Sequence, residues 1–231
     1  MKKIIFSMMI IAGMAFLSSC GGGSDKKSDG KDSVKTEVKD EIPADAKYGI
    51  KTAIVDYEME TMGMKMNQTL YIDAYGTKES TEVNSEMEMF GQKIKTHNLE
   101  FTKDGYKYSI DLEKKMGNKM KMIAPPKEAV EWNKLSDEVM KKMNIKKEGT
   151  EAICGVTCDI YSIDYKEMQM KGKNWVYKGI SMKSEMTAMG FPVKLKAVKF
   201  QENVAIPADK FEVPKDVKIT DVDAAKAPKK K

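Results

Sequence analysis

The sequence predicts an α+β domain of mostly antiparallel strands, in which a curved half-barrel sheet carries one or more helices across its concave face. Three observations predict this fold. Apolar and polar residues alternate with a period of two along most of the chain, and glycine-containing turn signals separate these runs every 10–15 residues or so. A single stretch near the middle has a helical period instead.

The chain begins with a segment typical of secreted lipoproteins. Two lysines precede an apolar run over residues 4–17, which is shorter than the roughly 20 residues that a membrane-spanning helix needs. The run ends in Leu-Ser-Ser-Cys at residues 17–20, which resembles the lipobox of bacterial lipoproteins. The resemblance implies that residues 1–19 are a signal peptide and that Cys20 is acylated and anchors the chain in membrane lipid. A plain signal peptide followed by an unmodified cysteine is the alternative.

Residues 20–45 are predicted to form a flexible tether after the lipidated cysteine. From Gly21 to Ser33 they contain only Gly, Ser, Asp and Lys, which cannot bury enough apolar surface to offset the entropy of ordering. Gly21 replaces the aspartate that retains enteric lipoproteins at the inner membrane, so we expect an outer-membrane address, on the periplasmic face or the cell surface. The domain is predicted over residues 46–219, with a Lys-rich tail over 220–231.

The composition argues against several classes of function. All 40 basic residues are lysine, whereas phosphate recognition favours arginine, so we expect no nucleic-acid partner. The single histidine, His97, lies in a polar strand stretch and has no second histidine with which to hold a metal. The chain contains no Gly-rich phosphate loop, no His-Glu-x-x-His and no Gly-x-Ser-x-Gly motif. We therefore expect a protein that is not an enzyme and has no metal or cofactor, with His97 on the surface.

Cys154 and Cys158 are a candidate disulfide pair, because the predicted compartment permits one. In an extended strand their Cα atoms would lie roughly 13 Å apart, whereas a disulfide requires less than about 7 Å. The bridge can form only if Gly155 makes a tight turn. Two buried thiols are the alternative.

The alternating runs predict an antiparallel meander of long strands, apolar on one face and charged on the other. They cover residues 53–59, 64–72, 106–112, 176–186 and 193–197. The turn signals are Met62-Gly63, Tyr75-Gly76, Phe90-Gly91, Asp104-Gly105, Met116-Gly117-Asn118, Lys171-Gly172 and Met189-Gly190.

Residues 127–143, after two prolines, are predicted to form one amphipathic helix. Trp132, Leu135, Val139 and Met143 fall near one face of it. The apolar face of the sheet is the surface on which such a stripe can be buried.

Methionine is unusually frequent, with 20 residues in the chain and four of them between positions 57 and 66. We interpret this strip as a hairpin that turns at Met62-Gly63 and lines the concave face. Flexible thioether side chains suit variable apolar ligands, although they can equally fill a dry core. The predicted cavity-lining residues are Met59, Met64, Met66, Leu70, Tyr108, Ile110, Trp132, Leu135, Val139, Ile180 and Met182.

Residues 155–161, 173–183 and 206–214 form an ordered series that resembles the C-terminal half of the LolA/LolB-type lipoprotein-carrier fold, and in particular uncharacterised lipoprotein relatives. In that fold a half-closed barrel, lidded by helices, encloses an apolar cavity that holds acyl chains in the carriers. The carriers latch the lid with an arginine, and this chain has none. The resemblance therefore implies a hydrophobic-cavity protein at the outer membrane, not the sorting carrier.

Three functions follow as hypotheses. The first is an envelope lipoprotein that binds lipid or acyl chains in a hydrophobic cavity. The second is a non-catalytic structural or protein-interaction lipoprotein without a ligand, whose protein partner is unknown. The third is a soft-metal site for Cu(I), because sulfur ligands suit soft cations. Its candidate ligands are Met59, Met62, Met64, Met66, Met87 and Met89.

Overall fold

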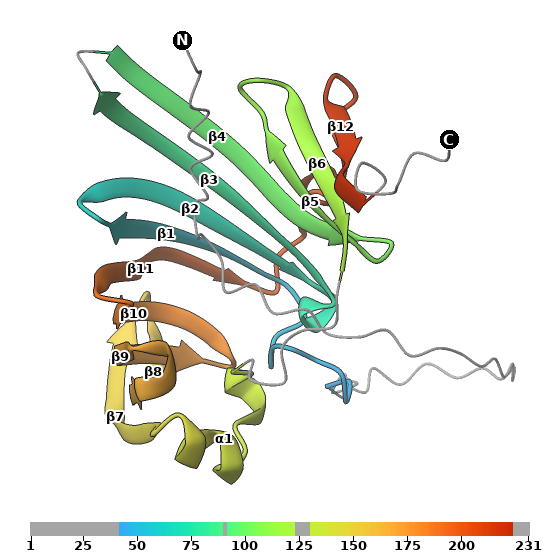
Figure 1. Ribbon diagram of the computed structural model, residues 1–231. Coiled ribbons are helices and arrows are strands. Elements are labelled where there is room, and N and C mark those ends of the chain that lie inside the picture. Colours follow the sequence, from blue (N-terminus) through green and yellow to red (C-terminus); the bar gives the residue numbers. More distant parts are fainter. Residues whose placement is uncertain (1–41, 90–91, 123–129, 224–231) are drawn as a thin grey trace, which may run out of the picture.

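The computed structural model describes residues 42–89, 92–122 and 130–223 (Figure 1). Several predicted features lie outside the described residues. These are the signal peptide over 1–19, the acylation site at Cys20, most of the tether, the turn at Phe90-Gly91, the first residues of the predicted helix and the end of the Lys-rich tail.

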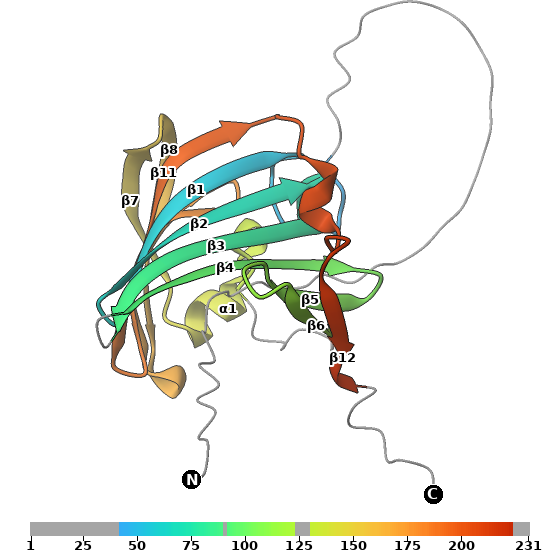
Figure 2. The same cartoon turned by 90° about the horizontal axis from the view of Figure 1, so that it is seen from above.

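The described chain forms one open sheet of twelve strands in the order β12-β6-β5-β4-β3-β2-β1-β11-β10-β9-β8-β7. Neighbouring strands are antiparallel except β12 and β6, which are parallel. Figures 1 and 2 show that the sheet is strongly curved. The predicted, mostly antiparallel sheet is confirmed. The strands are β1 (Ala53–Thr61), β2 (Met64–Asp73), β3 (Lys78–Met89), β4 (Gln92–Lys103), β5 (Tyr106–Asp111), β6 (Met116–Lys121), β7 (Lys146–Ile153), β8 (Val156–Tyr165), β9 (Met170–Tyr177), β10 (Ile180–Ala188), β11 (Phe191–Glu202) and β12 (Lys218–Asp221).

Tight two-residue turns join many of the antiparallel neighbours. In each of these turns both residues have positive φ and the second is glycine, which is the type I′ geometry that matches the twist of a hairpin. The turns at Met62–Gly63, Asp104–Gly105 and Met189–Gly190 were predicted from the sequence and are confirmed. The turns are Met62–Gly63, Asp104–Gly105, Cys154–Gly155, Lys178–Gly179 and Met189–Gly190.

Two other predicted turns are wrong, because Gly172 lies inside β9 and Gly117 inside β6. A Cβ atom on Gly172 would lie 2.1 Å from the carbonyl oxygen of Glu185. One on Gly117 would lie 2.8 Å from the carbonyl oxygen of Ser109. These glycines let neighbouring strands approach closely, which is the other common use of glycine within a strand.

The predicted helix over 127–143 is wrong in its extent. The described part contains a 3₁₀ turn, η2 (Trp132–Lys134), and a short helix, α1 (Asp137–Lys142). Leu135 is extended between them, and the Ser136 hydroxyl accepts a hydrogen bond from the Val139 amide at 3.2 Å. An N-cap residue has extended backbone dihedrals, so the Ser136 cap starts a new helix and ends any helix that precedes it.

The buried side chains form four clusters. The largest joins β1 and β2 to β7–β11 and includes Tyr48 and Ile50, which precede β1. The second joins η2 and α1 to β8–β10. The third is the methionine hairpin with its neighbours, and the fourth joins β4 and β5 to the segment after β11.

Candidate functional site

The methionine strip forms the predicted hairpin. Met59 lies directly opposite Met66, and Thr61 opposite Met64, on either side of the turn. Met59 and Met66 are only 9% and 5% exposed, and they cluster with Val83 on β3 and Leu195 on β11. Opposed residues of an antiparallel pair share one face of a sheet. We call the face that carries Met59, Met64, Met66, Val83 and Leu195 the methionine face.

Tyr108 and Ile110 lie on the opposite face, so the structure does not bring them to the methionine hairpin. Val83 pairs with Asn98, and the next residue along β4, Leu99, pairs with Ile110. Tyr108 stacks on Phe101 with ring centroids 4.9 Å apart. The segment after β11 covers this patch with Val213, Val217 and Ile219. A period of two cannot show which face of one strand matches which face of the next, because register decides it.

Trp132, Leu135 and Val139 pack on the methionine face of the sheet, over β8–β10. Their cluster includes Ile163, Tyr165 and Met170. The Trp132 ring lies 5.3 Å from that of Tyr161.

Strand pairing establishes which face this is. Tyr161 pairs with Asn174, Asn174 with Ser184, and Ser184 with Leu195, a member of the methionine face. With its amide oxygen turned toward Trp132, Asn174 accepts a hydrogen bond from the indole Nε1 at 3.1 Å. The helical segment and the methionine hairpin therefore lie on one face of the sheet, over different strands.

Leu70, Ile180 and Met182 belong to the largest core cluster. They are buried together with Trp175 and Cys158. These three predicted cavity-lining residues fill a packed core, which was the alternative interpretation of the apolar pattern.

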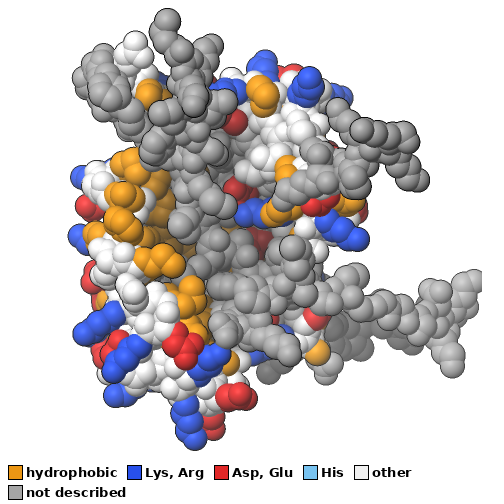
Figure 3. Space-filling view, viewed as in Figure 1, with side chains coloured by type: hydrophobic (Ala, Val, Ile, Leu, Met, Phe, Trp, Pro, Cys, Tyr) orange, Lys and Arg blue, Asp and Glu red, His pale blue; other side chains and the backbone are white. Residues whose placement is uncertain are grey.

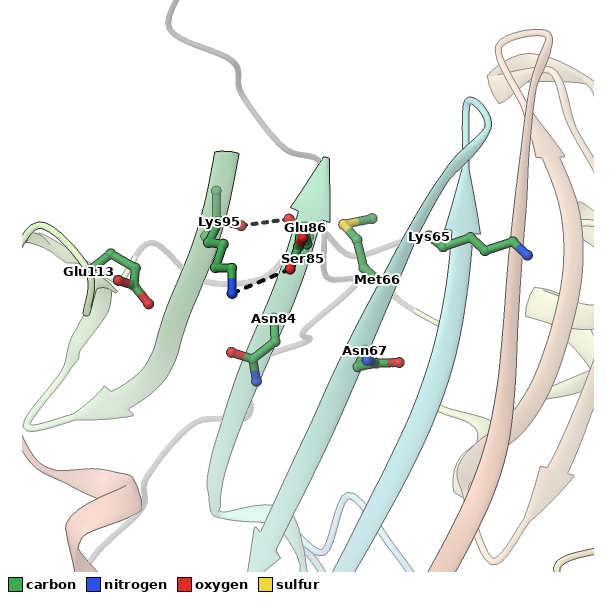
Figure 4. Close-up of a pocket in the computed structure, with 9 residues that line it drawn as sticks. Lys65, Met66, Asn67, Asn84, Ser85, Glu86, Lys95 and Glu113 are labelled. Carbon is green, nitrogen blue, oxygen red and sulfur yellow. Dashed lines mark hydrogen bonds and ion pairs between the residues drawn. The ribbon is translucent and has the colours of Figure 1, made fainter. Parts of the chain in front are cut away.

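A pocket of about 400 Å³ lies over β2, β3 and β4 (Figure 4). Glu86 pairs with Lys93 and Lys95, with N–O distances of 3.3 and 3.4 Å, and these lysines lower the pKa of its carboxyl group. Acyl-binding pockets are mostly apolar, whereas Met66 is the single apolar residue of this lining. The lining residues are Lys65, Met66, Asn67, Asn84, Ser85, Glu86, Lys95, Thr96 and Glu113.

Glu82 is the centre of a hydrogen-bonded charge cluster that sequence reasoning missed. It accepts from Lys210 Nζ at 2.7 Å and from Tyr71 Oη at 3.1 Å, and His97 Nε2 lies 2.5 Å from its other oxygen. Burial acts to raise the pKa of Glu82, but the hydrogen bonds from Lys210 and His97 outweigh it and the pKa is lowered. His97, expected on the surface, is half-buried. No local motif could have revealed the cluster, because Lys210 lies 128 residues along the chain.

The two cysteines near the β7–β8 turn are both free. Cys154–Gly155 forms the tight turn that a disulfide would require. Cys154 is exposed, and its Sγ lies 3.3 Å from the carbonyl oxygen of Ala197. Cys158 is fully buried, and burial raises the pKa of its thiol to about 11.

The described residues contain no group of three His, Cys, Asp or Glu side chains that could hold a metal ion. Of the candidate soft-metal ligands, Met59 and Met66 face each other, whereas Met62 lies at the exposed turn. None of the helices in the described ranges is both long and apolar enough to cross a bilayer.

Comparison with known proteins gives similarity at the level of solved structures. Neither a protein family nor a curated protein matches the sequence. An uncharacterized conserved protein from Thermus thermophilus aligns over 74% of this chain and 90% of its own, with 9% identity and a TM-score of 0.49. MucB aligns over 75% of this chain with 8% identity and a TM-score of 0.47, and this chain spans 60% of its length. LprF from Mycobacterium bovis aligns over 70% of this chain and 90% of its own, with 13% identity and a TM-score of 0.36. These values do not assign a function.

Proposed function

We propose that this chain is a non-catalytic, lipid-anchored protein of the outer membrane that binds an acyl chain or a similar apolar ligand. The ligand would lie on the methionine face, beside η2 and α1, which we infer to be the concave face of the sheet. The observation that carries the proposal is that the Met59–Met66 cluster and the Trp132–Leu135–Val139 cluster share one face of a curved, open sheet. The lipobox resemblance at Cys20 supports the anchor.

The chemistry of the methionine face suits such a ligand. Met59, Met66 and Val83 are buried, yet Leu195 is the only further described apolar side chain that packs against their cluster. Burial of each ligand CH₂ group contributes about 0.8 kcal/mol. Unbranched, polarizable methionine side chains repack around ligands of different shape, so the face can accept acyl chains of more than one length.

A protein-interaction lipoprotein without a ligand is the second candidate. The lining of the 400 Å³ pocket favours this second candidate, because eight of its nine residues are polar or charged and such a pocket does not fit an acyl chain.

The test is native mass spectrometry of the protein extracted from its own envelope, in the wild type and in Met64→Asp. Met64 is half-buried on the methionine face, so a carboxylate there should expel an apolar ligand without emptying a core position. Met120→Asp, the same change at an exposed position on β6, is the matched control. A denaturing mass spectrum separates covalent acyl groups on Cys20 from a ligand that dissociates.

We expect bound lipid on the wild type and on Met120→Asp, and its loss from Met64→Asp. Extracted wild-type protein without any lipid adduct would reject the proposal and favour the interaction protein. Equal lipid on all three proteins would place the ligand elsewhere.

A further inference from the structure

Three turns at one end of the sheet carry exposed apolar side chains. Met62 lies in the β1–β2 turn and is 62% exposed. Met168, 48% exposed, lies in η3 (Lys166–Met168) between β8 and β9. Met189 and Phe191, 63% and 52% exposed, lie at the β10–β11 turn. We call these four residues the apolar tip.

The three turns are neighbours in space. Thr61 pairs with Val193, which places the β1–β2 turn beside the β10–β11 turn. Ala188 pairs with Met170, and the Met189 amide donates to the carbonyl oxygen of Gln169 at 3.2 Å. The β1–β2 and β10–β11 ends lie on the left in Figure 1, and Figure 3 shows a band of apolar side chains on that side of the same view.

The described turns at the opposite end of the sheet do not carry such exposed apolar side chains. The turns at Asp104–Gly105, Cys154–Gly155 and Lys178–Gly179 carry no exposed large apolar side chain. Single exposed apolar residues are normal on any protein, whereas a group of them on adjoining turns marks an interaction surface.

The charges around the apolar tip are compatible with lipid headgroups. Within these turns and the two residues on either side there are three lysines and three acidic residues, and a fourth lysine, Lys194, lies four residues after Gly190. Glu60 pairs with Lys194 at 4.0 Å, and Glu167 accepts from Tyr165 Oη at 2.8 Å. Lysine stems can extend along apolar surface while their ammonium groups reach phosphates. The charged residues are Glu60, Lys65, Asp164, Lys166, Glu167, Lys171 and Lys194.

We propose that the apolar tip inserts into the surface of the membrane to which the chain is anchored. The inference rests on the proposed anchor at Cys20. The tether predicted over residues 20–45 would have a root-mean-square reach of about 25–30 Å and an extended length of about 85–90 Å. It enters the domain at the opposite end of the sheet, where the Gly49 amide donates to the Lys178 carbonyl oxygen, so it must extend along the roughly 30 Å of β1 for the tip to reach the bilayer, which its extended length allows. The domain is thereby held at high effective concentration next to one bilayer, so even a weakly partitioning patch of four side chains docks there.

The test measures the depth of single labelled positions in the full, acylated chain, reconstituted in phosphatidylethanolamine–phosphatidylglycerol vesicles. The parent carries Cys154→Ser, which removes the exposed thiol. Met62→Cys and Met189→Cys place an environment-sensitive fluorophore at the tip. Val198→Cys is the matched control, because Val198 is 51% exposed on β11 but seven residues from Phe191, roughly 23 Å along the strand. Thr77→Cys, exposed at the opposite end, is the second control.

Nitroxide groups on the lipid acyl chains should quench the probes at positions 62 and 189 severalfold more than those at 77 and 198. Lys166→Glu with Lys171→Glu should weaken this quenching, since each lysine near an anionic surface contributes about fivefold to partitioning.

Equal quenching at all four positions, on protein that remains bound to the vesicles, would overturn the docking and leave the anchor intact. Protection of the tip probes from a water-soluble quencher without quenching by lipid would also overturn it, because the tip would then contact protein. Absence of any association with vesicles would overturn both docking and anchor. Loss of the acyl ligand is detected separately by native mass spectrometry.

Discussion

The ammonium group of Lys210 lies 2.7 Å from the carboxylate of Glu82 and joins the segment after β11 to strand β3. Lys210 belongs to the 3₁₀ turn η4 (Ala208–Phe211), which packs on β3 and β4. The residues that follow cover Leu99 and Ile110 and lead to β12. This ion pair therefore helps to hold the cover of one core cluster in place.

Lys210→Met should lower the free energy of unfolding at pH 7 by about 1–2 kcal/mol, because charge-assisted hydrogen bonds at a partly exposed site contribute about that much. The pKa of Glu82 is lowered in the folded protein from its usual 4.5. The Glu82–Lys210 pair therefore contributes to the free energy of unfolding above pH 4.5, and this contribution is lost as the pH falls through the folded-state pKa of Glu82. Urea unfolding of the wild type and of Lys210→Met, at pH 7 and near pH 3, measures the loss of stability at each pH.

Lys199→Met, at an exposed position on β11, is the control and should leave the unfolding midpoint nearly unchanged. If Lys210→Met destabilised the protein equally at both pH values, Lys210 would act through packing of its stem and not through Glu82.

Gly172→Ala should destabilise the protein by about 2–3 kcal/mol, because the new methyl group would overlap the Glu185 carbonyl oxygen at 2.1 Å. Gly149→Ala makes the same change in β7, where a Cβ would have no atom within 4 Å. It should change stability by less than about 0.5 kcal/mol. Urea midpoints compare the two variants, and similar small shifts would contradict the close approach of β9 to β10.

Cys154 should react with iodoacetamide in the folded protein at neutral pH, and Cys158 should not. Cys154 is exposed, whereas Cys158 is fully buried and its pKa of about 11 leaves little thiolate. Peptide mass spectrometry after alkylation locates the label, and unfolding in urea should release Cys158. Failure of both to react until a reductant is added would establish the disulfide instead.

Much of the local structure could be predicted from the sequence. The alternation that ends at Met59 and resumes at Met64, with Met62-Gly63 between, is sufficient for a hairpin with a type I′ turn. The helical prediction was less accurate, because the cap formed by Ser136 outweighs an apolar spacing that continues through it.

The sequence by itself determined several of the strands, three of the tight turns and the apolar side of those strands, because these depend on residues close together in the chain. It did not separate β9 from β10, because the alternating run over 176–186 continues through the turn at Lys178–Gly179. Only the tertiary structure decided which apolar sides meet. Met59 faces Leu195 from the far end of the chain, while Ile110 faces away from both, because register between strands is set by long-range pairing. Gathering of Met62, Met168 and Met189 at one end is likewise a property of the assembled sheet, since no local pattern relates these three turns.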